Sequence, residues 1–361
     1  MTTRIALRNA MEVLQHLGDA TPPWDAFLQT SKEFIGAEGA SLVMFDGKLN
    51  LNEMRQTGHD SATEREYVDH FYQYDAFAQA TRGSPAGKWW DSVELSSTPE
   101  ARKLPFYADF MPRHKLGQVV ALILLTEPGR HIVVSFQRMN ARANAVEEFS
   151  NGNARIFTEA LLRAVKTRVD AAAVRLSAVE SALSSINEVV FLVNKNGNLV
   201  RCSPAAYEFL EDAKMLSATR REVMHEQPNV MRGMLQALSM ALATSRPRQY
   251  CVPLSWGLGI RFDITAAPDN LRLADESLLM VRARKTSAFD VPEAAELATF
   301  FGLTVAESRV LLQLVEGHSP KDIAVSNAVA ERTVRNQIAS LMTKMSCTRM
   351  SELVRLGSLL R

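Results

Sequence analysis

Apolar residues toward the carboxyl end of the chain recur at intervals of three and four, the spacing of helices that bury one face. Thr304, followed three residues later by Glu307, predicts a capping box at the start of the first of these helices. Gly317 ends that helix. Ser319 supplies an N-cap and Pro320 a first-turn proline for a second helix. Two short helices are therefore predicted, close together in the sequence.

A third helix is predicted over residues 331–345, because Val334, Ile338 and Leu341 form an apolar stripe. A fourth, over 350–360, closes an all-α bundle. Polar residues of the third helix point away from the stripe, and they are Arg332, Arg335, Asn336, Gln337, Ser340 and Lys344. Arg, Asn and Gln bond base edges in the major groove, and Lys and Ser hold phosphates. This face is predicted to contact DNA; the alternative is a solvated bundle with no nucleic-acid role.

Apolar residues between positions 162 and 186 alternate steps of three and four without a break. They are Leu162, Val165, Val169, Ala172, Leu176, Val179, Leu183 and Ile186. This a/d heptad seam predicts a connecting helix over residues 153–187 that pairs with a second copy as a coiled coil, which makes the protein a homodimer. Because Val169 and Ala172 are small, the alternative is a long amphipathic helix packed on its own domain.

Five short strands are predicted in the middle of the chain, at residues 188–193, 199–202, 249–254, 260–266 and 277–284. The NKNGN sequence of residues 194–198 joins the first two as a hairpin, and a helix starts at Ser203 and Pro204. This order predicts a small antiparallel sheet with helices on one side. In this order the segment 181–287 resembles a PAS domain. It has no flavin-type cysteine motif and its His225 is isolated, so no cofactor is expected.

The first 152 residues combine strand and helix patterns, which predicts an α+β domain. Strands are predicted over residues 40–45, 118–126 and 130–136, and helices over 25–35 and 62–77. The turn Glu127-Pro128-Gly129 joins the last two strands as a hairpin.

Aromatic residues are concentrated in this first domain. Because ligand pockets are mainly apolar with a few placed polar groups, they predict a cavity for a small-molecule effector. The candidate ligand-binding residues are Tyr67, Phe71, Tyr72, Tyr74, Asp75, Trp89 and Trp90. Arg82 and Asp91 are further polar candidates. The alternative is that most of these aromatic side chains simply fill the core.

Composition is that of a globular protein, with 47% hydrophobic and 22% charged residues among 361. The longest apolar runs fall far short of the ~20 residues of a membrane helix, and the first residues lack the apolar run of a secretory signal. A cytoplasmic protein without membrane contact is expected. The net charge is only +1, so DNA affinity has to come from a local patch. From Thr304 onward eight basic residues face five acidic ones, a local charge of about +3.

Sequence motifs for catalysis are missing from the chain. Cys202, Cys251 and Cys347 are odd in number and widely separated, which gives no metal-ligand spacing. The sequence has no nucleophile elbow, Walker loop, dinucleotide fingerprint or metal-spaced set of His and Cys. Neither an enzyme nor a metal site is therefore expected.

Residues 303–356 resemble the LuxR-type (GerE-like) helix-turn-helix along their whole length. The matching positions are Leu303, Thr304, Glu307, Val310, Leu311, Gly317, Ser319, Ile323, Ala324, Thr333, Val334, Arg335 and Lys344. The resemblance implies that Arg335, Asn336 and Ser340 face bases. It implies phosphate contacts for a second set, which is Lys321, Arg332, Thr333 and Lys344.

Three positions depart from this family pattern. Ala328 stands where the turn usually has Gly, Ala330 where it has Ser, and Gln337 where the third helix has His. Ala at a position needing positive φ is strained, and loss of the Ser cap costs ~1 kcal/mol. The turn is therefore expected to differ in shape, and the operator sequence cannot be taken from the family.

The segments EYVDHFYQYDAFA, GKWWD and FYADFMPRHKLG resemble the GAF-like N-terminal domain of LuxR-type regulators that carry a second sensor. They also weakly resemble the acyl-homoserine-lactone-binding domain. Tyr67, Asp75 and Trp90 would correspond to its ligand contacts, but Ala76 replaces the proline.

These patterns together predict a multidomain α+β protein. Two α/β sensor domains, GAF-like over 1–152 and PAS-like over 181–287, are joined by the long helix, and an all-α four-helix helix-turn-helix domain follows over 288–361. The expected function is a ligand-responsive dimeric transcription regulator on palindromic double-stranded DNA, with RNA polymerase among the candidate partners. The alternatives are a signalling adaptor with a degenerate helix-turn-helix and a quorum-sensing lactone receptor.

Overall fold

The computed structural model describes residues 2–81, 83–219, 221–255, 258–274, 276–287 and 293–360. Arg82, one of the polar candidates above, lies outside them. The chain divides into two compact units, and each is described by itself. Unit 1 comprises Met1–Val252 and Ile260–Arg284, and unit 2 comprises Pro253–Gly259 and Lys285–Arg361.

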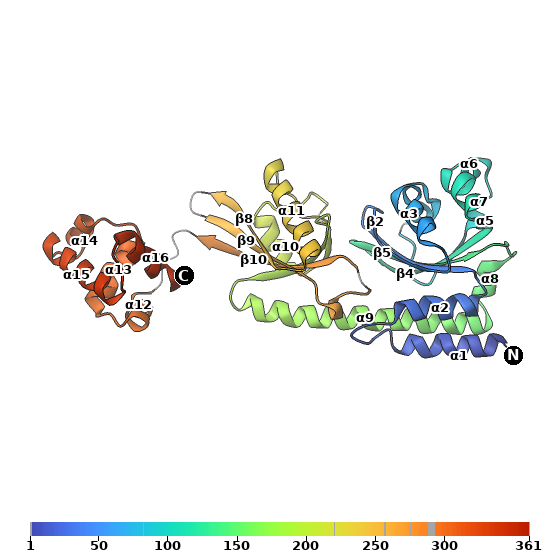
Figure 1. The fold of residues 1–361 in the computed structure, drawn as a ribbon, viewed down its shortest axis with the longest axis horizontal. Coiled ribbons are helices and arrows are strands. Elements are labelled where there is room, and N and C mark those ends of the chain that lie inside the picture. The colour runs from blue at the N-terminus through green and yellow to red at the C-terminus, as the bar shows by residue number, and fades with distance from the viewer. Residues whose placement is uncertain are drawn as a thin grey trace. The chain divides into compact units, whose positions relative to one another are not determined.

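The amino-terminal half of unit 1 is built around a five-stranded antiparallel sheet (Figure 1). Its strands are β1 (Gly39–Asp46), β2 (Leu51–Thr57), β3 (Trp89–Asp91), β4 (Gln118–Glu127) and β5 (Arg130–Arg138), in the order β2-β1-β5-β4-β3. The three strands predicted from the sequence are confirmed. The sequence analysis missed β2, whose seven residues are all half-buried and do not alternate between faces, and β3, which has only three residues.

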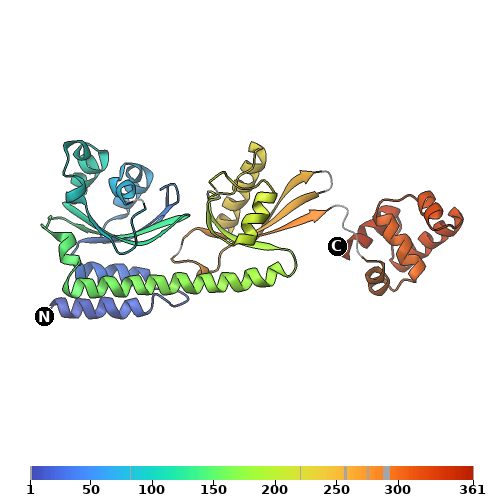
Figure 2. The ribbon, with the colours of Figure 1, turned by 180° about the vertical axis from the view of Figure 1, so that it is seen from behind.

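Helices cover both faces of this sheet (Figures 1 and 2). One face packs against α1 (Thr2–Gln15), α2 (Trp24–Ile35) and the amino-terminal half of α9 (Gly152–Ser184), preceded by the short α8 (Ala145–Phe149). The other face is covered by shorter elements, which are α3 (Ser61–Asp69), the 3-10 turn Phe71–Tyr74, α4 (Ala76–Ala80), α5 (Ser92–Leu95), α6 (Pro99–Arg102), the π-turn Phe106–Phe110 and α7 (Met111–Arg113). Two apolar cores result, one on each face of the sheet.

The single helix predicted over residues 62–77 is wrong, because the structure divides this segment into three pieces. Asp75 has an extended backbone, with φ −72° and ψ 106°, and its side chain caps α4 by accepting a hydrogen bond from the amide of Phe77. A side chain that competes for backbone donors in this way favours a helix start over a helix interior.

The long helix α9 forms as predicted, but its seam serves a different purpose. Val165, Val169, Ala172 and Leu176 are 8% exposed or less within the single chain. Val165 and Val169 join the core beneath the first sheet, and Ala172 and Leu176 join a core beneath a second sheet of unit 1. The prediction that these four residues pair with a second copy is therefore wrong. Their small side chains let the surrounding elements of the same chain pack closely onto the helix.

The ends of the seam are less covered. Leu162 and Leu183 are half-buried and pack against the same two cores. Val179 is 38% exposed and Ile186 is 60% exposed, so among the eight seam residues only these two present a sizeable apolar surface to solvent.

The carboxyl-terminal half of unit 1 contains most of another five-stranded sheet, in which the strand ends at residues 253–255, 258–259 and 285–287 are counted with unit 2. Its strands are β6 (Val189–Asn194), β7 (Leu199–Cys202), β8 (Arg248–Ser255), β9 (Leu258–Ala266) and β10 (Leu278–Ser287), in the order β7-β6-β10-β9-β8. All five strands were predicted. Two helices, α10 (Pro204–Asp212) and α11 (Pro228–Thr244), pack on one face and bury Leu210, Met234 and Leu238 against it.

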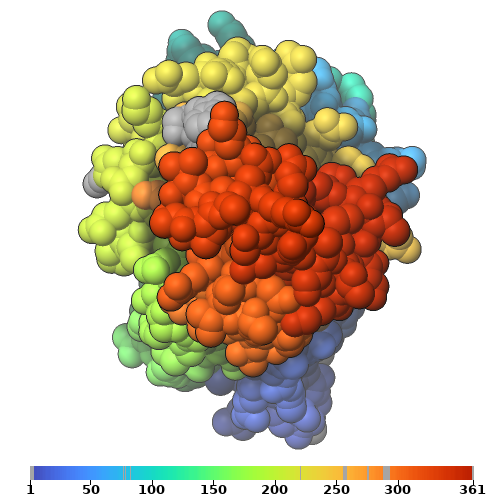
Figure 3. Space-filling view, turned by 90° about the vertical axis from the view of Figure 1, so that its left-hand side faces the viewer, coloured from blue at the N-terminus to red at the C-terminus, as the bar shows by residue number. Residues whose placement is uncertain are grey.

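Unit 2 is a bundle of short helices, whose surface is seen in orange to red in Figure 3. The helices are α12 (Ala294–Phe301), α13 (Val305–Val315), α14 (Pro320–Ser326), α15 (Glu331–Lys344) and α16 (Met350–Gly357). The last four match the predicted helices, except that residues 358–360 form a 3-10 turn. The first, α12, was not predicted, and its Leu297 is buried in the common core.

Of the helices described, none has by itself the length and apolar character needed to cross a membrane. Among the described helices, one pair, α12 and α13, meets the requirement of length and apolar composition when the two are taken together, and the chain bends by 115° between them.

Candidate functional site

The turn between α14 and α15 departs from ideal geometry where the sequence predicted it would. Ala328 has a φ of +52°, a left-handed conformation that is unfavourable for any residue with a Cβ. Ala330 is the N-cap of α15, and its methyl side chain accepts no hydrogen bond from the first turn. By contrast, Ser319 caps α14 and exchanges hydrogen bonds with Asp322 in a capping box.

Helix α15 buries Val334, Ile338 and Leu341 and turns a polar row outward. Six of the eight proposed DNA contacts are exposed, namely Lys321, Arg332, Thr333, Arg335, Asn336 and Lys344. The other two, Gln337 and Ser340, are half-buried. Arg335 donates through Nε and Nη2 to Oε1 of Glu331, at 2.9 and 2.7 Å. Because this pair is exposed on both sides, it contributes little to stability, and an anionic partner can replace Glu331.

Glu307 organises the inner side of this helix, a role that the sequence analysis assigned only in part. Its carboxylate accepts hydrogen bonds from the amide and hydroxyl of Thr304, both at 2.8 Å. It also accepts from Oγ of Ser340 and Nζ of Lys344, each at 2.7 Å. The ammonium of Lys344, followed by the Thr304 amide and the Ser340 hydroxyl, lowers the pKa of Glu307 to about 2.

Ser340 and Lys344 therefore have an intramolecular partner, Glu307, that the sequence analysis did not identify. The signal was present, because Glu307 lies one turn into α13 on the side that carries Val310 and Leu311. A carboxylate on a buried face needs a cation or donors nearby. DNA contact by Ser340 and Lys344 stays a prediction.

A cavity lies in the N-terminal half of unit 1, between the sheet and the covering elements α3, α4 and 106–110. Its apolar wall includes Phe77, Phe106 and Phe110 from the cover and Val119 and Val133 from the sheet. Its volume, taken as the space open to the centre of a water molecule, is about 70 Å³. Since one water needs roughly 10–15 Å³ by this measure, the cavity has room for about half a dozen water-sized groups.

Tyr67 and Asp75 line this cavity, as predicted from the sequence. The Tyr67 hydroxyl donates to Oδ2 of Asp75 at 2.7 Å, and the amide of Phe77 donates to Oδ1 at 2.8 Å. Burial raises the pKa of Asp75 to about 6 and raises that of Tyr67 well above its usual value. A carboxyl group that ionises near neutrality and a fixed phenol are thus held together in an apolar wall.

The remaining aromatic candidates are not among the cavity residues. Phe71 is buried, and Tyr72 half-buried, in the core beside the cavity, while Tyr74 is 37% exposed. Trp89 faces the opposite side of the sheet, where it stacks on Phe149 and donates to Oγ1 of Thr158. Phe71, Tyr72 and Trp89 therefore pack in the cores, as the space-filling alternative expects, whereas Tyr74 lies at the surface. Trp89 points away from the cavity because adjacent strand residues point to opposite faces.

Two further candidates, one aromatic and one polar, also have other surroundings. Trp90 lies on the cavity side of β3 and packs at the edge of the core there, with Nζ of Lys88 4.1 Å from its ring centroid. Asp91 caps α5 through the amide of Val93 and accepts from Nε2 of Gln118 at 2.8 Å. Asp91 is therefore a structural residue.

The sequence analysis missed a polar group that the sheet brings into the cavity. Gln137 is 7% exposed and donates through Nε2 to the hydroxyls of Ser135 and Ser41, at 3.0 and 3.3 Å. Its Oε1 atom and Nε2 of His59 make no hydrogen bond of good geometry among the described residues. Burial lowers the pKa of His59, and the neighbouring Gln137 side chain opposes that shift. These atoms are buried acceptors or donors that a ligand can satisfy.

The described residues contain no group of three or more His, Cys, Asp or Glu side chains placed to hold a metal ion. The three cysteines are described as free thiols. Burial raises the pKa of Cys202 to about 12.

Comparison with solved structures gives distant overall likenesses. The ligand-binding domain of VqsR from Pseudomonas aeruginosa has 13% identity and a TM-score of 0.35, with 45% of this chain and 94% of that chain covered. CepR2 of Burkholderia cenocepacia, an N-acylhomoserine lactone dependent LuxR family transcription factor, has 12% identity and a TM-score of 0.34, covering 46% and 95%. Escherichia coli SdiA has 10% identity and a TM-score of 0.32, covering 98% and 96%. Such low TM-scores support no argument about this chain.

A comparison with curated protein sequences finds no match. The family comparison is specific to one segment, since residues 302–356 match the model described as bacterial regulatory proteins, luxR family. The matched segment begins at the C-cap of α12 and ends within α16. It therefore contains α13 with its capping box, the helices α14 and α15 with the turn between them, and Glu307 with its partners Thr304, Ser340 and Lys344. Residues 302–356 are therefore a helix-turn-helix domain of the luxR family.

Proposed function

We propose that the protein is a ligand-responsive, DNA-binding transcription regulator. The observation that carries this proposal is the outward polar row on α15 of a luxR-family helix-turn-helix, in which Arg332, Arg335 and Asn336 are exposed. The second helix of such a motif lies in the major groove, where Arg and Asn bond base edges. Arg335 and Asn336 are proposed to contact bases, and Gln337 lies beside them.

Other residues are proposed to position the helix. Lys321, Arg332 and Thr333 are exposed near the amino-terminal ends of the two helices, where phosphate contacts fix the register on the duplex. Ser340 and Lys344 hold α15 against α13 through Glu307, so their proposed contribution to DNA binding includes this indirect one.

Selection of binding sites from a random duplex pool, with the full chain, tests the DNA-binding role. Arg335→Ala and Asn336→Ala are expected to weaken affinity for the selected site by roughly 5- to 150-fold, since each good base contact is worth ≈ 1–3 kcal/mol. Arg309→Ala is the matched control, because Arg309 is exposed on α13, outside the α14 and α15 pair. Failure to enrich any sequence would favour the adaptor alternative, which the strained turn at Ala328 motivates.

The proposed effector is a small neutral or cationic molecule held in the cavity of the N-terminal half. Asp75 and Glu64 line this cavity, whereas no lysine or arginine among the described residues does. An anion would lie unpaired beside a buried carboxylate, which is strongly unfavourable. Gln137 Oε1 offers an acceptor for a hydroxyl or amine of the ligand.

A thermal-shift series on the full chain tests this charge selection with benzyl alcohol, benzylamine and benzoate as size-matched probes. The alcohol or the amine is expected to raise the melting temperature in step with its concentration, and benzoate is not. Val133→Trp, which fills the cavity, should abolish the shift, while Val174→Trp on the exposed side of α9, where Val174 is 71% exposed, should leave it unchanged. Stabilisation by benzoate alone would contradict the proposal.

Lactone sensing is a narrower form of the same proposal. Tyr67 and Asp75 support it by lining the cavity. The small volume disfavours long acyl chains unless the covering elements move apart.

The remaining assignments are proposals of organisation. We propose a GAF-like ligand-sensing domain over 1–152, a PAS-like domain over 181–287, and the output domain over 288–361 of a cytoplasmic protein. Two copies would bind half-sites one helical turn apart in a palindrome, and RNA polymerase is a candidate partner at the promoter. The dimer contact has to lie outside the buried part of the α9 seam.

A further inference from the structure

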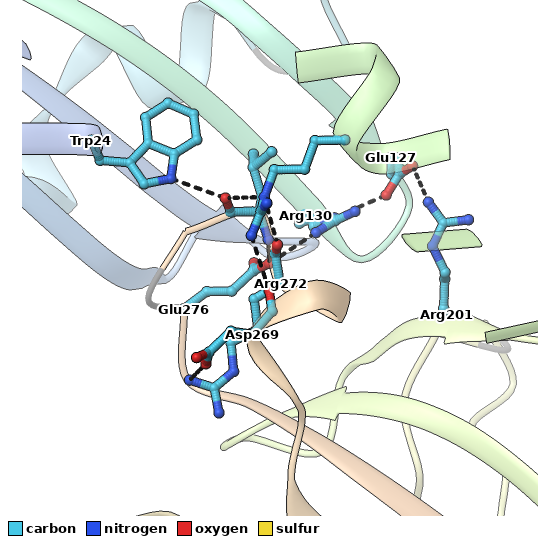
Figure 4. A network of polar contacts seen from close by, with 9 residues as sticks. Trp24, Glu127, Arg130, Arg201, Asp269, Arg272 and Glu276 are labelled. Atoms are coloured by element: carbon cyan, nitrogen blue, oxygen red, sulfur yellow. Dashed lines mark hydrogen bonds and ion pairs between the residues drawn. The ribbon is translucent and has the colours of Figure 1, made fainter. Parts of the chain in front are cut away.

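A loop of the second sheet of unit 1 is built into the core of the first half. The segment between β9 and β10 buries Leu273 and Ala274, 2% and 4% exposed, in the same apolar core as the helices α1, α2 and α9. The indole of Trp24 donates through Nε1 to the carbonyl oxygen of Leu273 at 3.0 Å (Figure 4). The first half therefore completes its core with residues that follow it by more than a hundred positions.

Arg168 of α9 holds the backbone of this loop. It is 4% exposed, and Nε donates to the carbonyl oxygens of Arg272 and Leu273 at 3.0 and 2.8 Å, while Nη2 donates to that of Asp269 at 2.9 Å. Its Nη1 donates to the carbonyl oxygen of Asp19 at 2.6 Å. Hydrogen bonds from a charged donor are roughly twice as strong as neutral ones, so one side chain fixes both the loop and the α1–α2 connection.

A buried ion pair joins the loop to the β4–β5 hairpin (Figure 4). Arg130, 6% exposed, donates through Nη1 to Oε1 of Glu276, 3% exposed, at 3.1 Å. Arg130 also donates through Nε to Glu127 at 2.9 Å, which pairs in turn with Arg201 of β7 at 3.3 Å. The same Oε1 of Glu276 accepts from the amide of Leu273 at 2.7 Å. Removing one partner of such a pair leaves a buried charge uncompensated.

The hairpin also connects to the cavity. Strand β5 starts at Arg130 and continues to Val133 and Ser135, which line the cavity. The next residue after Arg130 is His131, 4% exposed, whose Nε2 lies 3.1 Å from Oγ1 of Thr81. Thr81 belongs to the cavity wall. Because neighbouring strand residues point to opposite faces, Arg130 faces the second half of unit 1 while His131 faces the cavity cover.

We propose that the 269–276 loop is a coupling element between the cavity and the second half of unit 1. A change in the cavity wall at Thr81 passes to His131 and to its neighbour Arg130 in β5. Arg130 in turn sets how tightly the loop, and with it the second half of unit 1, is held through Glu276. The proposal rests on the proposed function only for the identity of the signal, a bound effector. Coupling of this kind requires that a change at one end alter the equilibrium at the other, and this is measurable without ligand or DNA.

Hydrogen-exchange mass spectrometry on the full chain tests the coupling. The amides of Leu271, Arg272 and Leu273 are hydrogen-bonded within the loop, so their exchange reports its opening. Glu276→Gln is expected to speed their exchange by tenfold or more. Thr81→Val, which removes the hydroxyl beside His131, is expected to speed it severalfold, although Thr81 makes no hydrogen bond to the described residues of the loop.

Matched controls separate coupling from general destabilisation. Glu188→Gln changes another buried carboxylate, 7% exposed and 3.4 Å from Arg282 within the second half. Thr57→Val removes a hydroxyl that donates to Gln29 at 3.1 Å on the far edge of the first sheet. Neither control is expected to change exchange in the loop.

A double replacement tests the relay itself. Arg130→Met with Glu276→Met exchanges the buried pair for apolar groups, which is often neutral for stability. In this background Thr81→Val should no longer affect the loop. Equal loop exchange in Thr81→Val and Thr57→Val, or an undiminished Thr81→Val effect in the Met pair, would overturn the proposal. Absence of DNA or effector binding would refute the proposed function while leaving this result standing.

Discussion

In the turn that precedes α15, the substitution Ala328→Gly is expected to raise the free energy of unfolding, whereas most substitutions lower it. Ala328 has a φ of +52°, a conformation that costs an L-residue roughly 1–2 kcal/mol and glycine almost nothing. Replacing Ala328 by glycine relieves that cost in the folded state. Glycine also makes the unfolded chain more flexible, which lowers stability by about 0.4–1 kcal/mol and partly offsets the relief. The free energy of unfolding of the domain is therefore expected to rise by about 0.5–1 kcal/mol.

The neighbouring cap adds a second, independent gain. Ala330 is the N-cap of α15, and Ala330→Ser supplies the oxygen that accepts from the first turn, worth about 1 kcal/mol. Because the two changes act through different terms, a backbone conformation and a side-chain hydrogen bond, the double variant is expected to gain close to their sum, roughly 2 kcal/mol. For a domain of this size that corresponds to a rise in melting temperature of about 10 °C.

Native-state hydrogen exchange of the core amides of α13 and α15, in the full chain, measures these changes locally. The matched control is Ala339→Gly, because Ala339 is an exposed residue inside the same helix where glycine costs about 0.5–1 kcal/mol. The two glycine variants should thus differ in sign. A loss of stability in Ala328→Gly as large as that in Ala339→Gly would refute the backbone-strain argument.

Three further predictions concern ionisation and packing. The pKa of Glu307 is lowered from 4.5 to about 2. Its ionised form therefore stabilises unit 2 fully above about pH 4.5, and this stabilisation is lost as the pH falls through 2. In urea unfolding, Glu307→Gln should remove that pH dependence. The pKa of Asp75 is raised from 3.8 to about 6, so its ionisation disfavours folding, and the free energy of unfolding should fall by about 3 kcal/mol as the pH rises from 3.8 to 6. The difference in unfolding free energy between wild type and Asp75→Asn isolates this component. A difference that does not change with pH would contradict the prediction. Leu273→Ala should cost about 2–5 kcal/mol and speed exchange in β1 and β5, although residue 273 follows them by more than a hundred positions; a loss confined to β9 and β10 would argue against a shared core.

Local chemistry in the sequence was enough to place most of the elements. The capping residues Thr304 and Ser319 start α13 and α14 where predicted, and the NKNGN turn separates β6 from β7. These signals act over a few residues, so they do not depend on the rest of the fold. Strand β2 was not predicted, because its half-buried residues do not alternate between buried and exposed. The helix predicted over 62–77 was too long, because Asp75 caps a new helix instead of continuing the preceding one.

The seam of α9 shows where periodicity stops being informative. A spacing of three and four establishes that one face of a helix is apolar and buried, and Val165 and Leu176 are buried. The same spacing suits a partner helix and the chain's own domain equally well. Only the tertiary contacts show that α1 and the 269–276 loop occupy that face.

The sequence by itself determined the helices of the luxR-type domain, the outward polar row on α15 and the strain of its turn, because caps, periodicity and the conformational limits of alanine are local properties. Only the tertiary structure decided that Ser340 and Lys344 turn toward Glu307, that Gln137 joins Tyr67 and Asp75 in one cavity, and that Arg130 meets Glu276. Those residues are 33 to 146 positions apart for the pairs that bond directly, and no periodic pattern links residues at such separations. Their proximity follows from the register of β5 in its sheet and from the packing of a distant loop into the first core.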